Sequence, residues 1–354
     1  MMKRMTGLLI TAWEVLIMSD LAEFVAANAD KIRKIESIFI KYPRLTSILD
    51  CIEECREMSK FSEEPQCMFI TGGSGVGKTS LIRQYSSRWP SIEMPDGDIH
   101  PVFKTSIPAS ATIKSVATAM LSDLGDLAAT HGTTVTQSNR LYALVHQCKV
   151  EVIIIDEFQH LIDNKTQRVI GLVADWIKMF IEITKIPVIL IGMPESEAIL
   201  HQSPQLRRRF LTKKRLTPFL WDSEANRNEF RKFLAEVDKS LPFDVYSNLA
   251  SEEIAYRLFV ASQGTAANIM SLIKHAAYDA IRHNHPCLTL AHLGTAFDSI
   301  QYDTTLPNNP FLVETSVISS WKATSRITHS EIGTNNRVKA KPKELTIRAT
   351  IRRR

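Results

Sequence analysis

The chain has 354 residues, which is enough for about two domains with a buried core. Its apolar, charged and aromatic fractions of 44%, 23% and 8% are ordinary for a soluble globular protein, and five scattered cysteines are too few for a disulfide framework. The formal net charge of +5 is concentrated in residues 302–354, where ten Lys and Arg outnumber four acidic residues, so the rest of the chain is close to neutral.

The N-terminus imitates a signal peptide, but Glu14 interrupts its apolar run and no cleavage site follows. The run is also too short to cross a bilayer, as is every other apolar stretch. Met18 begins a more typical N-terminus, so residues 1–17 are either an upstream-start artefact or a short amphipathic arm. We therefore expect no membrane association and a cytoplasmic protein with reduced thiols.

An amphipathic helix is predicted from about Pro43, preceded by a short apolar segment.

The run from Cys67 to Ile70 predicts a buried strand that leads into a complete G-x-x-x-x-G-K-[ST] loop. Glycines let the backbone N–H groups converge on phosphate oxygens, and the following helix adds its N-terminal dipole. Lys78 would reach the β and γ phosphates of ATP, and the Thr79 hydroxyl would hold Mg²⁺. A glycine-rich turn that binds nothing is the alternative, and the complete spacing argues against it. The residues expected to bind nucleotide are Gly72, Gly73, Ser74, Gly75, Val76, Gly77, Lys78, Thr79 and Ser80. In many P-loop ATPases, the residues before the first strand fold over the adenine base, and here that segment would be Ile38 to Arg44.

Between this loop and the next motif, the pattern predicts a helix over 80–89, a strand over 101–107 and a helix over 113–124. A Gly/Thr-rich loop over 131–138 then precedes a helix that ends near Cys148. Three polar residues near the ends of these elements, Lys114, Thr133 and Thr134, are most simply interpreted as solvated surface.

A second motif occupies residues 151–161. Four apolar residues predict a buried parallel strand whose C-terminal end presents Asp156 and Glu157, where ligands bind in open α/β sheets. In this Walker B sequence, Asp156 would order the Mg²⁺ shell and Glu157 would act as general base toward the attacking water.

A helix over 166–184 and a strand over 186–194 follow. An AAA+ ATPase usually places a polar sensor residue at the end of this strand, but here the strand ends in Gly192, Met193 and Pro194. The sensor role is therefore unfilled or passes to Glu195 or Ser196. Next come three arginines in residues 205–210. They form either a solvated face or an arginine finger for a neighbouring subunit's ATP, with Arg209 the first choice and Arg208 the second.

Beyond residue 216 the pattern is helical, with helices predicted over 224–239, 252–262, 266–282 and 290–300. Apolar periodicity fades after residue 303, which predicts a flexible basic tail. Within the tail, residues 308–314 and Trp321 are apolar islands that would dock on a partner or pack on the preceding helices.

The P-loop, the Walker B strand, the arginine segment and a helical lid, in this order, resemble an AAA+ ATPase over about residues 36–302. The expected parts are an N-terminal arm (1–35), an α/β core with a parallel sheet (36–214), an all-helical lid (215–302) and the tail (303–354). Four segments, SEEPQCMFITGGSGVGKTS, VIIIDEFQHL, IPVILIGMPES and QLRRRF, narrow the resemblance to the TnsC/TniB transposition regulators, including those of CRISPR-associated transposons.

The resemblance implies an ATP-dependent homo-oligomer that wraps duplex DNA as a ring or filament without sequence preference. A TniQ-type target selector would recruit it, and its tail would engage the transposase. By position, Arg209 would act in trans, and Lys114, Thr133 and Thr134 would contact the DNA backbone.

AAA+ lids commonly carry an arginine in a Gly-x-x-Arg pattern. This sequence departs from that pattern, because the residue three positions after Gly264 is Ala267. We therefore expect slow hydrolysis, with ATP acting mainly as an assembly switch. Two alternatives stay open: a replication-type helicase loader, and a scaffold or signalling NTPase with no role on DNA.

Overall fold

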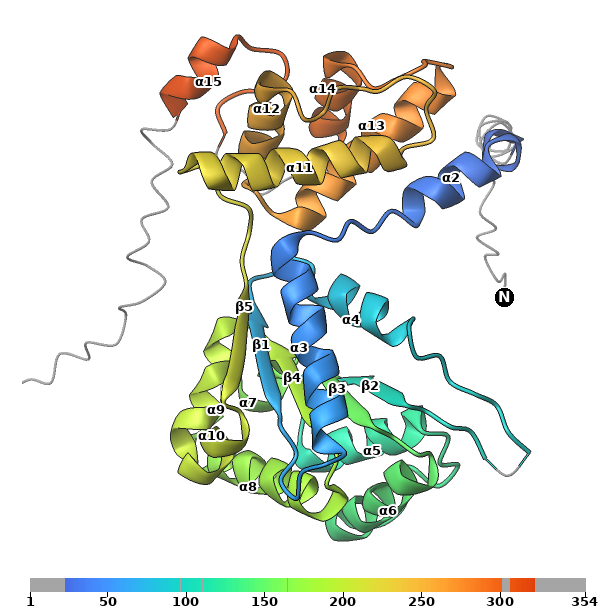
Figure 1. The fold of residues 1–354 in the computed structure, drawn as a ribbon, viewed down its shortest axis with the longest axis vertical. Coiled ribbons are helices and arrows are strands. Elements are labelled where there is room, and N and C mark those ends of the chain that lie inside the picture. The colour runs from blue at the N-terminus through green and yellow to red at the C-terminus, as the bar shows by residue number, and fades with distance from the viewer. Residues whose placement is uncertain (1–22, 96, 110, 164, 301–305, 322–354) are drawn as a thin grey trace, which may run out of the picture. The chain divides into compact units, whose positions relative to one another are not determined.

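The computed structural model describes residues 23–95, 97–109, 111–163, 165–300 and 306–321. The chain divides into two compact units, Met1–Leu312 and Val313–Arg354, which are described separately. The first unit is built on a five-stranded parallel sheet in the order β2-β3-β4-β1-β5 (Figure 1). The strands are β1 (Met68–Gly72), β2 (Val102–Ser106), β3 (Val152–Asp156), β4 (Val188–Gly192) and β5 (Thr212–Leu216).

The three central strands, β1, β3 and β4, are buried along their whole length. Continuous apolar runs are what a parallel sheet covered on both faces requires, and they are the reason these strands were predictable. Strand β5 was not predicted, because its sequence TKKRL is basic and shows no apolar alternation. It lies at the edge of the sheet, where pairing with β1 holds the backbone while the long side chains reach solvent.

The helices from α2 to α10 lie around the sheet, except α2, which contacts the later helix α13 (Ala266–Arg282) (Figure 1). They are α2 (Ala29–Glu36), α3 (Pro43–Ser59), α4 (Lys78–Ser86), α5 (Ile113–Asp123), α6 (Thr134–Gln147), α7 (Gln159–Ile162), α8 (Gln167–Thr184), α9 (Ala198–Gln202) and α10 (Pro204–Arg209), with a 3₁₀ turn η1 (Pro194–Glu197). The loop predicted over 131–138 is wrong in its second half, because Thr133 caps a helix that begins at the next residue. Its hydroxyl accepts the N–H of Thr136 at 3.2 Å, which starts α6 five residues early.

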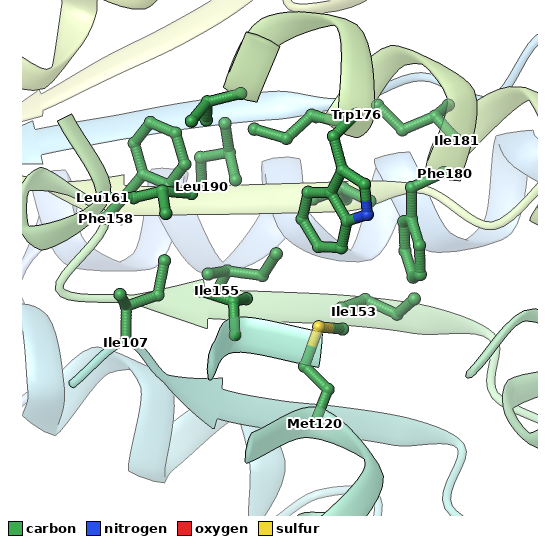
Figure 2. Close-up of a cluster of buried hydrophobic side chains, with 14 of the residues drawn as sticks. Ile107, Met120, Ile153, Ile155, Phe158, Leu161, Trp176, Phe180, Ile181 and Leu190 are labelled. Atoms are coloured by element: carbon green, nitrogen blue, oxygen red, sulfur yellow. The ribbon is translucent and has the colours of Figure 1, made fainter. Parts of the chain in front are cut away.

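One face of the sheet carries the main core (Figure 2). Ile153 and Ile155 of β3 and Leu190 of β4 point toward Trp176 and Phe180 of α8. The alternate residues of these strands point to the other face, where α3 and α4 lie (Figure 1). The sheet is thus covered on both sides, and its C-terminal strand ends stay free of this packing.

Four helices follow the sheet, as predicted: α11 (Glu224–Ser240), α12 (Glu252–Ser262), α13 (Ala266–Arg282) and α14 (Leu290–Ser299). The apolar island after them packs locally. Phe311 is buried, the amide of Asn309 donates to the carbonyl of Gly294 at 2.9 Å, and the guanidinium of Arg257 donates to the carbonyl of Pro310 at 2.6 Å. Of the two roles considered for this island, packing on the lid helices is the one observed for its residues up to Leu312.

The second unit contains one described helix, α15 (Thr315–Trp321). The predicted artefact or arm at residues 1–17 and most of the predicted flexible tail lie outside the described residues. All five cysteines are free. Among the residues that the structure describes, no helix combines the length and apolar character that a membrane crossing needs.

Candidate nucleotide site

The predicted phosphate-binding loop links the end of β1 to the start of α4. Gly75 and Gly77 adopt φ values of 73° and 104°, which are left-handed conformations that glycine adopts without strain. At Gly72, an added Cβ would lie 2.6 Å from the carbonyl oxygen of Leu216 on β5. The loop therefore needs glycines both for its turn and for its close approach to the edge strand.

Lys78, the first residue of α4, turns back into this loop. Its ammonium donates to the carbonyl oxygens of Gly72 and Gly73, each at 2.8 Å. Burial lowers the pKa of Lys78, while the charges of Glu157 and Asp156 act in the opposite direction. When a nucleotide binds, its phosphate oxygens would replace these two carbonyl oxygens as the hydrogen-bond partners of the ammonium.

The Thr79 hydroxyl and the Asp156 carboxylate meet across the site, with 3.5 Å between Thr79 Oγ1 and Asp156 Oδ2. The other oxygen of Asp156 accepts the N–H of Glu157 at 2.8 Å. Burial raises the pKa of Asp156. One hydroxyl and one carboxylate at this separation suit Mg²⁺, a hard cation that takes few protein oxygens and keeps waters and phosphate oxygens as its other ligands.

Glu157 leaves the strand in a left-handed conformation, with φ of 54°, which is uncommon for a residue with a side chain. Its carboxylate accepts a hydrogen bond from the amide of Gln159. The amide oxygen of Gln159 accepts the N–H of Met193 at 3.1 Å. Sequence reasoning missed Gln159; the only signal available was its position two residues after the Walker B acid.

The two residues predicted to take the sensor role after β4, Glu195 and Ser196, do not contact Lys78. Ser196 is fully buried and Glu195 is exposed. The neighbour of Lys78 at this end of β4 is Met193, whose sulfur lies 3.8 Å from the ammonium.

The phosphate-binding loop from Ser74, together with Glu157, Gln159 and Met193, lines a cleft of about 750 Å³. The segment before α3 lines the same cleft. Ile38, Phe39 and Ile40 line its apolar end together with Met270 of α13. This places the segment predicted to cover the base along the same cleft as the P-loop. The volume is in the range of small-molecule sites.

Helix α13 closes the cleft from the lid side. The N–H of Ala267 donates to the carbonyl of Gly75 at 2.9 Å, and a Cβ at Gly75 would lie 2.9 Å from the Thr265 methyl. The position where many AAA+ lids carry an arginine thus contacts the loop through its backbone. Further along α13, Lys274 pairs with Glu36 at 2.6 Å, and the Tyr278 hydroxyl donates to the same carboxylate.

The three arginines of α10 differ in exposure. The Arg209 side chain is only 14% exposed and lies 3.8 Å from Glu182 of α8, while Arg207 and Arg208 are exposed. The residue that was our first choice for a trans finger is packed against its own subunit, and the second choice, Arg208, is free to reach a neighbour.

The candidate DNA contacts lie away from the cleft-lining residues, at the N-termini of two packed helices. Lys114 is in the first turn of α5, and Thr133 caps α6 with Thr134 following. The helices are joined there: the Thr118 hydroxyl donates to the carbonyl of Lys114 at 3.0 Å and accepts from Gln137 at 2.9 Å. Lys114 and Thr133 are exposed, and Thr134 is half-buried.

The bacterial TniB protein family matches residues 31–219, which is more than half of the chain. No curated protein is significantly similar in sequence. Among solved structures, the chain is similar to Cdc6p from Pyrobaculum aerophilum, with a TM-score of 0.56 and 12% identity over 77% of this chain and 72% of that one. The Orc2 protein of Aeropyrum pernix, solved in ADPNP and ADP complexes, gives a TM-score of 0.55 and 13% identity over 77% and 73%.

The Aeropyrum pernix Orc1 protein, solved in complex with DNA, gives a TM-score of 0.52 and 15% identity over 74% of this chain. The chain spans 66% of the length of that protein. At these identities the likeness establishes the fold, which is that of an AAA+ P-loop ATPase: a parallel sheet with flanking helices and further helices after the last strand.

Proposed function

The chain belongs to the bacterial TniB family, and from this premise we propose that it is an ATP-hydrolysing regulator of DNA transposition that assembles on duplex DNA. The observation that carries the proposal is the convergence of Lys78, Thr79, Asp156 and Glu157 at one end of the sheet, where Lys78, Thr79 and Glu157 line one cleft. A glycine-rich turn without function would not bring a buried lysine and two acids together.

In the proposed reaction, the loop N–H groups and Lys78 bind the triphosphate. Thr79 and Asp156 would hold Mg²⁺, which when bound neutralises charge on the β and γ phosphates. Glu157 orients a water and accepts its proton as that water attacks the γ phosphorus and ADP departs. The apolar segment 38–40 and Met270 bind the base.

ATP bound in this cleft favours the assembled state by population shift, and hydrolysis releases it. On DNA, Lys114, Thr133 and Thr134 contact phosphates, so binding is independent of sequence and weakens with salt. A TniQ-type selector recruits the assembly, and the basic C-terminal segment contacts the transposase. Slow turnover fits the absence of a lid arginine at Ala267.

The test is co-elution of the purified protein with an unrelated DNA duplex in ATP, ADP or a slowly hydrolysed ATP analogue. ATP-dependent assembly on the duplex is expected, and Lys78→Ala should abolish it because the triphosphate loses its ammonium partner. Lys239→Ala is the matched control, since it removes one exposed charge whose ion pair is with Glu236 one turn away on α11. A wild-type protein that ignores DNA in every nucleotide state would reject this proposal in favour of the scaffold alternative.

A further inference from the structure

Gln159 connects two parts of the site that are 36 residues apart in the chain. Its Nε2 donates to the carboxylate of Glu157 after β3, and its Oε1 accepts the N–H of Met193, the first residue after β4, at 3.1 Å. We propose that Gln159 is a positioning residue that fixes the Glu157 carboxylate relative to the end of β4 for hydrolysis. This inference rests on the ATPase function proposed above.

The space around Gln159 is shaped for its amide. The side chain is 7% exposed, so its polar atoms need partners within the protein. An added Cβ at Gly192 would lie 3.0 Å from the Gln159 amide oxygen and 2.6 Å from the Ser196 hydroxyl. Glycine at the last position of β4 therefore leaves room for the amide to reach between the two strands.

Glu157 needs such a partner because its backbone fixes only the start of the side chain. The left-handed φ of 54° sets the direction in which the side chain leaves the strand, but the remaining torsions stay free. His160 offers a looser alternative, with its Nε2 3.8 Å from the same carboxylate oxygen and its side chain 35% exposed. The hydrogen bond from Gln159 is the closer and more buried restraint.

The other end of the amide lies at Met193, a residue without a polar side chain. Strand β4 lies between β1 and β3, so its end adjoins both the phosphate-binding loop and the Walker B acids. Met193 there approaches Lys78 only through its sulfur. Gln159 supplies the polar connection between the end of β4 and the general base that no side chain of residue 193 can supply.

The substitution Gln159→Glu tests the hydrogen bond to Glu157 separately from the hydrogen bond to Met193. It keeps an acceptor for the Met193 N–H, removes the donor to Glu157 and places a second carboxylate beside it. We expect ATP turnover at neutral pH to fall at least about tenfold with the dissociation constant for ATP changed less than about threefold. The acid limb of the pH–rate profile should move to higher pH, because adjacent carboxylates resist ionising together.

Two further variants separate positioning from packing. Gln159→Ala should lower turnover without moving the pH profile. The control is Gln137→Ala, which removes a buried amide bonded to Thr118 and to the Ala129 carbonyl outside the cleft. This control should lower the melting temperature and leave the turnover per folded protein and its pH profile unchanged.

A second readout does not need turnover. In protein labelled with ¹⁵N-glutamine, the side-chain signals of Gln159 are identified by their absence in Gln159→Glu. They should shift in Glu157→Gln, which removes the carboxylate that accepts the Gln159 N–H, and stay in place in Gln137→Ala.

Unchanged turnover in Gln159→Glu, faster turnover in Gln159→Ala, or Gln159 signals that stay unchanged in Glu157→Gln would each overturn the positioning role. A wild-type chain that neither binds nor hydrolyses ATP would instead reject the proposed function, and the glutamine signals would still show whether the contact exists.

Discussion

At the scale of single residues, the site holds charges that are unfavourable without ligand. Burial is the largest effect on Asp156 and raises the pKa of its carboxyl above the ordinary 3.8, with the charge of Glu157 adding to the rise and Lys78 opposing it. A carboxyl whose folded-state pKa is raised binds more protons folded than unfolded, so stability decreases as the pH rises from 3.8 through the folded-state value. At neutral pH, the ionised Asp156 therefore destabilises the protein while no cation is bound.

Asp156→Asn should accordingly raise the melting temperature of the nucleotide-free protein at pH 7. Asparagine keeps the acceptor for the Glu157 N–H and loses the buried charge, a gain of roughly 1 kcal/mol or about 2–4 °C. The difference from wild type should shrink as the pH falls toward 3.8. Mg²⁺-dependent ATP binding should be lost in the same variant.

Thermal melting between pH 4 and pH 8 checks this expectation, with Asp30→Asn as control. Asp30 is exposed and its ion pair is with Arg33 one turn away, so its replacement should change the melting temperature by little at any pH. Equal melting curves for Asp156→Asn and wild type at pH 7 would show that the buried charge carries no cost.

At the scale of elements, the exposure of the arginines on α10 favours Arg208 over Arg209 as the proposed trans finger. Arg209 is held by packing and by Glu182 of its own subunit, whereas Arg208 is exposed. Arg208→Ala should therefore lower ATP hydrolysis in DNA-bound assemblies at least about hundredfold without changing the melting temperature. Arg207→Ala, an equally exposed neighbour, is the matched control. Arg209→Ala should mainly lower stability.

Mixing subunits tests whether the action is in trans. A Glu157→Gln subunit lacks the general base but keeps Lys78 for ATP binding and assembly, and it carries Arg208; an Arg208→Ala subunit has the opposite defect. Mixed assemblies should recover hydrolysis that neither variant shows alone. Activity that stays absent at every mixing ratio, with assembly intact, would place Arg208 outside the neighbouring site.

The elements also show what a sequence can predict. The phosphate-binding loop and the Walker B strand are local: strand, glycines, Lys78 and the Asp156 pair follow one another, so spacing alone defines them. The edge strand β5 was missed because its stability comes from pairing with β1 and not from apolar residues of its own. The contact of Gln159 with Met193 depends on how β3 and β4 align, and the exposure of Arg208 depends on how α10 packs on α8. Neither leaves a pattern in the chain.

At the scale of the whole chain, the nucleotide cleft joins segments from opposite ends of the first unit. Glu36, at the end of α2, accepts from Lys274 at 2.6 Å and from the Tyr278 hydroxyl, both on α13 and both more than 230 residues away. These hydrogen bonds lower the pKa of Glu36 below its ordinary 4.5, so the contact is fully formed above that pH and is lost only as the pH falls below it. Between pH 6 and 8 the contact does not titrate. It ties the segment at the base end of the cleft to the lid helix.

Breaking this tie should weaken ATP binding. Glu36 and Lys274 are partly exposed, so we expect a loss of less than about 1 kcal/mol, or up to roughly fivefold in the dissociation constant, for Lys274→Met. Glu36→Gln separates the tie from a direct contact with ATP: removing a negative charge from the cleft would otherwise strengthen binding of an anion, so weaker binding in this variant identifies the tie. Lys239→Met, which breaks a pair of similar length on α11, should leave ATP affinity unchanged.

Fluorescent-nucleotide titrations of both single variants and the double variant complete the cycle. If Glu36 and Lys274 act through each other, the double variant should lose no more than either single one, and additive losses would show that they act separately.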